Sequence, residues 1–199
     1  MNLKKIKQWT NKTKFSFWII YLLSRLLSVL YIRFTKKVAP LPLFETLKDV
    51  ELGLEKISYL ADEFNLQGYA VPHFWMRTAE ETQWLMNKGI TSKFGQDCDE
   101  FAMYAAKALL QVPEAMHPMI LTVRWVMPDG SLQGHNVALY GYITQDWIRL
   151  YGHIGNWGHF RGYNSVAQLA TDIAKQGGGS LLSYATASVR LEMKYHESA

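Results

Sequence analysis

The feature that most constrains the fold is a change of hydrophobic period at Pro113. Before Pro113, apolar residues recur every three or four positions, which is typical of amphipathic helices. Three helices are predicted in this part, over about 44–64, 78–87 and 99–111. After Pro113 the pattern favours strands at 120–126, 135–143, 147–151 and 181–195, with one short helix at 166–173. Helices followed by an antiparallel sheet predict an α+β domain.

A long apolar segment precedes this domain. Residues 15–34 hold fifteen apolar or aromatic side chains, and Arg25 lies near the centre of the run. The length suits a helix that crosses a bilayer, which needs about 20 residues, although a central charge opposes insertion. A helix that packs on the domain or on another subunit is the alternative. Pro40 and Pro42 end any such helix, so we expect an anchor or docking element at 1–40 and a domain at 41–199.

The net charge of +4 comes from the N-terminal segment. Nine of the 21 lysine and arginine residues precede residue 40, which leaves 12 against 17 acidic residues in the remainder. An acidic domain gives no support to nucleic-acid binding, and we expect none. We expect membrane association through residues 15–34, or otherwise a cytoplasmic protein.

Cys98 is the only cysteine in 199 residues, so an internal disulfide is excluded. It lies in Asp97-Cys98-Asp99-Glu100-Phe101-Ala102, where a loop turns into the predicted helix at 99–111. The positive end of the helix dipole favours a thiolate at this position, whereas Asp97 and Asp99 oppose it. Cys98 is therefore a candidate nucleophile.

Acyl transfer through sulfur also needs a base, and a group that orients the base. His135 opens a predicted strand and is the candidate base. Asn156 is the preferred orienting residue and His153 the alternative, because the strand offers no carboxylate at that end. The backbone N–H of Cys98 and the side chain of Gln96 are candidate oxyanion donors. Nearby aromatic side chains are expected to shield the histidine, namely Trp147, Trp157, Phe160 and Tyr163.

The stretch from about Thr78 to Gly158 resembles the transglutaminase-like branch of the papain-like cysteine hydrolase superfamily. The resemblance rests on the segment around Cys98 and on the strand that begins with His135, and it covers under half of the chain. It implies a papain-like fold, with Cys98 as nucleophile, His135 as base and an aspartate or asparagine as orienting group. The chain departs from the commonest pattern because Asn156 stands where that aspartate is usual.

These observations predict a cysteine-dependent hydrolase or acyltransferase that acts on peptide or amide bonds through a thioester on Cys98. The alternative is an inactive papain-like module that serves in structure or binding, tethered to a membrane or a larger assembly. We expect a peptide or protein substrate and no cofactor. The spacing of His153 and His159 fits no standard zinc motif, so we expect no metal either.

Overall fold

The computed structural model describes residues 30, 34–35, 37–57, 77–89, 97–189 and 193–197. Contacts divide the chain into two compact units, Met1–Lys37 and Val38–Ala199, and the features described next all belong to the second unit. Most of the predicted helix at 15–34 lies outside the described residues, so the division into 1–40 and 41–199 stays a prediction. Within the described ranges, no helix combines the length and the apolar character needed to cross a membrane.

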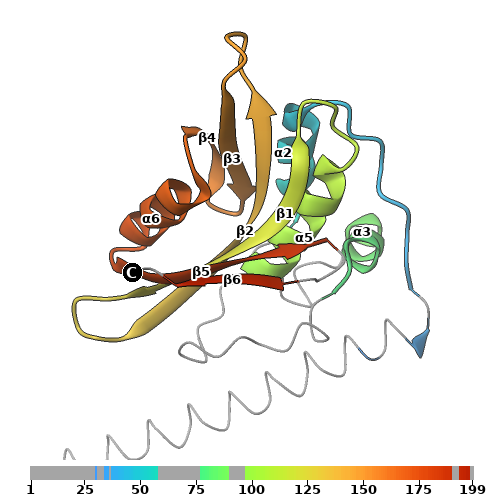
Figure 1. Cartoon of the computed structure of the whole chain (residues 1–199). Coiled ribbons are helices and arrows are strands. Elements are labelled where there is room, and N and C mark those ends of the chain that lie inside the picture. The colour runs from blue at the N-terminus through green and yellow to red at the C-terminus, as the bar shows by residue number, and fades with distance from the viewer. Residues whose placement is uncertain are drawn as a thin grey trace, which may run out of the picture. The chain divides into compact units, whose positions relative to one another are not determined.

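The second unit is a mixed domain in which helices lie on both faces of an antiparallel sheet (Figure 1). Its described helices are α2 (Leu47–Leu54), α3 (Ala79–Asn87), α5 (Cys98–Leu109) and α6 (Val166–Gln176). Its strands are β1 (Met116–Val126), β2 (Leu132–Ile143), β3 (Arg149–Gly155), β4 (Gly158–Tyr163), β5 (Ser180–Ser188) and β6 (Met193–Glu197). The strands are ordered β4-β3-β2-β1-β5-β6, and each neighbouring pair is antiparallel. The predicted α+β class is confirmed.

Local sequence signals explain where the helices begin. Thr78 caps α3, and its side chain and that of Glu81 exchange hydrogen bonds with each other's backbone N–H groups. Asp97 and Glu100 form the same kind of capping box at the start of α5. The predicted helices at 78–87, 99–111 and 166–173 are therefore confirmed, with small differences at their ends.

The predicted helix at 44–64 is confirmed in part, because the described portion of this range contains a shorter helix. Helix α2 begins after Thr46, which caps it, and ends at Leu54. The amide of Ile57 bonds to the carbonyl oxygen of Leu54, which forms a tight turn in place of a further helical turn. Ile57 is still buried. The apolar stripe therefore marks residues that pack in the core, although the chain is no longer helical at Ile57.

The second half of the sheet also differs from the prediction. The segment at 158–163, where no strand was predicted, forms β4 and pairs with β3. The predicted strand at 181–195 is two strands, β5 and β6. Trp147 was expected in a strand but lies in the β2–β3 turn with a φ of 60°. These strands are held by pairing with their neighbours, which short-range alternation does not reveal.

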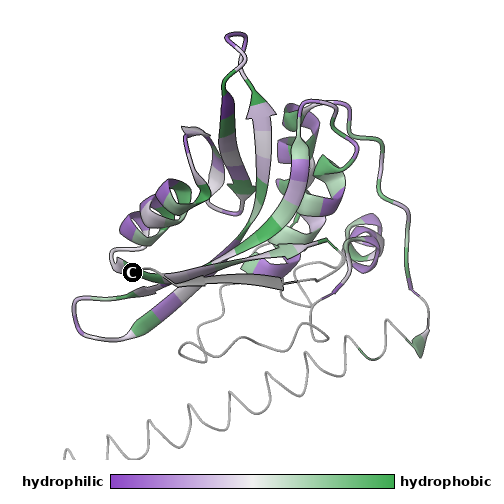
Figure 2. Ribbon diagram, viewed as in Figure 1, coloured by the Kyte–Doolittle hydropathy of each residue, from purple (hydrophilic) through white to green (hydrophobic). Residues whose placement is uncertain are grey.

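Two hydrophobic clusters lie on opposite faces of the sheet. Ala138 and Tyr140 of β2 face α2 and α5, whereas Val137 and Leu139 of the same strand face α6. Helix α6 is amphipathic (Figure 2) and covers the second cluster. This alternation follows from the two-residue period of a strand, and it decides which side chains near the start of β2 can meet Cys98.

Candidate functional site

Cys98 occupies the first position of α5 because the preceding residue caps the helix. The Asp97 carboxylate accepts the backbone N–H of Asp99 at 3.0 Å, and the Glu100 carboxylate accepts the N–H of Asp97 at 3.1 Å. Asp97 and Glu100 are both buried, whereas Cys98 is partly exposed. This local geometry holds the thiol at the entrance of the helix, as the sequence predicts.

The sulfur of Cys98 lies against the start of β2. The backbone N–H of Asn136 donates to Sγ, and Sγ–H donates to the Asp99 carboxylate at 3.5 Å. The Asn136 side-chain amide donates to the same Asp99 oxygen. Pairing between β2 and β3 begins only at Ala138, so the edge of β2 beside Asn136 is open to the sulfur. The helix start and the strand start thus meet at this edge.

The surroundings of Cys98 favour the thiol over the thiolate. Burial of the sulfur raises the pKa of Cys98 well above its usual value, and the charges of Asp99 and Asp97 raise it further. The Asn136 N–H opposes this rise in the pKa, but it is the weaker influence. Burial and the two carboxylates therefore oppose the thiolate together.

His135 lies on the other face of the sheet. It pairs with Val123 of β1 and shares its face with Val137, toward α6, while Asn136 faces α5. Its ring is 4% exposed and stacks on Trp157, with ring centroids 3.9 Å apart. Burial, reinforced by the nearby His153, lowers the pKa of His135 to about 3, so the ring is neutral.

Among the described residues, the nitrogen Nε2 of His135 has no hydrogen-bond partner, and no hydrogen bond joins His135 to Cys98. The structure brings the sulfur to the residue next to His135, and not to the imidazole itself. Trp157 is the side chain that touches the ring, as expected of a shielding aromatic residue. Trp147 is not one of the shields, because it is 88% exposed in the β2–β3 turn.

Neither candidate for the orienting residue bonds to His135. Asn156 lies in the turn between β3 and β4, and its buried Oδ1 has no partner among the described residues. His153 is fully buried on β3 and stacks on Phe160, with 5.1 Å between ring centroids. Burial lowers the pKa of His153 to about 4. In this state of the protein, the predicted hydrogen bond from His135 to Asn156 or to His153 is not formed. The other candidate oxyanion donor, Gln96, lies outside the described residues.

A second group of polar side chains lies beside these residues and was not anticipated from the sequence. His159 of β4 pairs through Nδ1 with the Glu51 carboxylate at 2.5 Å, and its other nitrogen bonds to the hydroxyl of Tyr140. Glu51 is 108 positions from His159, so no local signal connects them. Asn136 was not predicted as a site residue either, although it directly follows His135 in the sequence.

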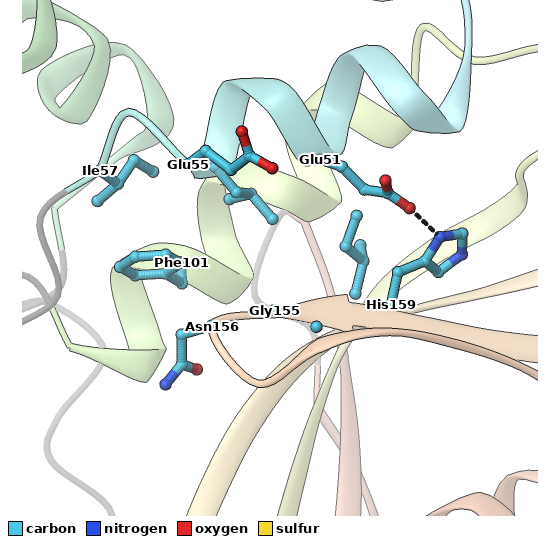
Figure 3. A pocket seen from close by; sticks show the side chains of 10 residues that line it. Glu51, Glu55, Ile57, Phe101, Gly155, Asn156 and His159 are labelled. Carbon is cyan, nitrogen blue, oxygen red and sulfur yellow. Dashed lines mark hydrogen bonds and ion pairs between the residues drawn. The ribbon is translucent and has the colours of Figure 1, made fainter.

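Figure 3 shows the cavity that Glu51 and His159 line. Its volume is about 510 Å³, within the usual range of ligand pockets. Phe101 also lines it, one helical turn after Cys98, as does Asn156. The cavity therefore comes within one helical turn of the candidate nucleophile, although Cys98 itself does not line it. Among the described residues, no group of three or more histidine, cysteine or acidic side chains is placed to hold a metal ion.

In comparisons with known proteins, no family model matches the sequence and no curated protein matches it. The papain-like, transglutaminase-like assignment therefore rests on the residues of this chain. What the structure establishes is a mixed helix and antiparallel sheet domain, with Cys98 at a helix start beside the open edge of β2.

Proposed function

We propose that the chain is a cysteine-dependent hydrolase or acyltransferase of the papain-like, transglutaminase-like kind, acting on peptide or amide bonds through a thioester on Cys98. One observation carries the proposal: Sγ at the first position of α5 and the side-chain amide of Asn136, the residue that follows His135, donate to the same Asp99 oxygen. The sulfur therefore lies beside the residue that follows His135, although Cys98 and His135 are 37 positions apart in the chain and the His135 ring itself faces α6.

A thiol with a raised pKa needs a base at the moment of attack, and the His135 ring is unprotonated at neutral pH. While it is buried, with a pKa of about 3, the ring is too weak a base to take the thiol proton, so the proposed mechanism requires it to leave its burial against Trp157. In the proposed reaction the His135 ring turns from Trp157 toward the edge of β2 and takes the thiol proton. Sγ bonds to the carbonyl carbon, and the backbone N–H groups of Cys98 and Asn136 donate to the oxyanion.

Two further steps, loss of the amine and attack on the thioester, complete the reaction. The carbon–nitrogen bond breaks as His135 gives its proton to the leaving amine, which leaves a thioester on Cys98. Water or a second amine attacks the thioester, the carbon–sulfur bond breaks, and the thiol regains its proton. Water yields hydrolysis, and an amine yields transfer.

Acyl trapping on the full chain tests the proposal. The protein is treated with p-nitrophenyl acetate, quenched in acid and mapped by mass spectrometry. We expect one acetyl group on Cys98, none in Cys98→Ala, and formation slowed roughly 10²- to 10⁴-fold in His135→Gln, the usual worth of a general base. Acetylation that spares Cys98, or that proceeds equally fast in His135→Gln, would refute the proposed mechanism.

A non-catalytic binding module is the second candidate. It is favoured by the missing hydrogen bond between Cys98 and His135 and by the stacking of His135 on Trp157. In either case, residues 15–34 are proposed to attach the domain to a membrane or an assembly. Slow, His135-independent acetylation of Cys98 would favour the module.

A further inference from the structure

The cavity beside Cys98 has a composition that points to one class of side chain. It lies between α2, the first turns of α5 and the turn from β3 to β4 (Figure 3). We propose that this cavity binds a basic side chain, lysine or arginine, of the peptide substrate. The inference rests on the proposed function, because it specifies the substrate of the same site.

The inner wall of the cavity is apolar. Leu54 and Ile57 line it from the side of α2, Phe101 lines it from α5, and Ile154 lines it from β3. Each of these four side chains is at most 5% exposed. A wall of this kind suits the methylene stem of lysine or arginine, which packs on apolar surface while its charged head stays in contact with polar groups.

Two carboxylates from α2 line the same cavity. Glu51 and Glu55 are four positions apart and so share one side of the helix, and both project toward the cavity in Figure 3. Glu51 is already paired with Lys48 at 2.8 Å and with His159 at 2.5 Å. Glu55 is exposed and forms no ion pair with a described residue, so it is the carboxylate that meets the incoming cation.

The cavity also contains an unused hydrogen-bond acceptor. The Oδ1 atom of Asn156 is buried and has no partner among the described residues. A buried acceptor without a partner is costly, and a backbone N–H of the bound peptide would satisfy it once the Asn156 side chain turned toward the peptide. Asn156 then positions the peptide while the carboxylates select its side chain. An acidic substrate side chain is disfavoured by Glu51 and Glu55 together.

Peptide binding to the full-length Cys98→Ala protein tests this assignment without requiring turnover. The probes are three blocked tripeptides that differ only in the central residue, which is lysine, norleucine or glutamate. We expect the lysine peptide to bind roughly threefold to tenfold more tightly than the norleucine peptide, and the glutamate peptide to bind most weakly. The lysine preference should weaken as salt is raised, because the carboxylates are partly exposed.

Glu55→Gln, made in the same background, keeps the shape of the side chain and removes its charge. It should reduce the lysine preference, whereas Glu45→Gln, an exposed carboxylate before α2, should leave the preference unchanged. Equal binding of the lysine and norleucine peptides, or a preference that survives Glu55→Gln, would overturn the inference. Selective binding by the Cys98→Ala protein, combined with no acetylation of Cys98 in the unaltered chain, would instead overturn the proposed catalysis and leave the pocket assignment standing.

Discussion

The imidazole of His135 stacks on the indole of Trp157, with ring centroids 3.9 Å apart and the planes 13° from parallel. The two residues come from different parts of the sheet, the start of β2 and the turn between β3 and β4. The stack buries the imidazole and contributes to the low pKa of His135, about 3. It therefore keeps the candidate base neutral while holding it away from the sulfur.

Replacing Trp157 tests the role of the stack. Trp157→Ala exposes the His135 ring, so we expect the pKa of His135 to rise from about 3 toward its ordinary value near 6.5. We also expect a loss of about 1–3 kcal/mol in the free energy of unfolding, since Trp157 is partly exposed. NMR titration of the histidine ring protons measures the first effect and urea denaturation the second. An unchanged pKa would show that Trp157 does not cause the burial.

Two buried histidines predict a specific pH dependence of stability. The pKa values of His135 and His153 in the folded protein are about 3 and about 4, below the unfolded value near 6.5. Below pH 6.5 the unfolded chain binds more protons than the folded protein, so the free energy of unfolding falls as the pH falls. Above pH 6.5 the contribution of the two histidines to stability is fully present. Between pH 6 and 5 each histidine contributes a slope of up to about 1.4 kcal/mol per pH unit.

Urea denaturation at several pH values between 7 and 5 measures this slope. His153→Phe keeps an aromatic ring at the stack with Phe160 and removes one titrating group. The dependence of the free energy of unfolding on pH should therefore lose the contribution of one histidine. Identical slopes for the wild type and His153→Phe would mean that His153 is not held neutral in the folded state.

The reactivity of Cys98 should report on its acidic neighbours. Because the charge of Asp99 raises the pKa of Cys98, Asp99→Asn should lower that pKa and speed alkylation by iodoacetamide at pH 8, roughly threefold to tenfold. In the wild type, the alkylation rate should still be rising above pH 9. Asp129→Asn, in the exposed β1–β2 turn, is the control and should leave the rate unchanged. A fast wild-type reaction at pH 7 would contradict the raised pKa.

Two ion pairs at different depths should differ sharply in their effect on stability. Arg77 and Glu100 are both fully buried, with Nη1 and Oε1 3.8 Å apart. Glu100→Ala leaves the Arg77 charge buried without this partner and removes part of the α5 capping box, so we expect a loss of about 3–5 kcal/mol. Glu80→Ala breaks the exposed pair with Lys107, also on α5, and should cost less than about 1 kcal/mol. Equal losses in urea denaturation would contradict this difference in burial.

Short-range signals were sufficient for the starts of α3 and α5. The capping boxes at Thr78 and Asp97 involve residues three apart, so the sequence alone reveals them. Strands with clear apolar runs, at 120–126 and 135–143, were also predictable. Strand β4 was not, because its glycines and polar residues become a strand only by pairing with β3.

The candidate site, like the fold, was predictable from the sequence only where short-range signals determine it. The amino-acid sequence by itself determined that Cys98 begins a helix and that His135 belongs to the second long strand after that helix. Only the tertiary structure decided that Asn136 faces Cys98 while His135 faces α6, because a shift of one residue in strand register exchanges the two faces of a sheet. Register is set by the packing of α5 and α6 on opposite sides of β2, and that packing joins residues too far apart in the chain for any local pattern to record.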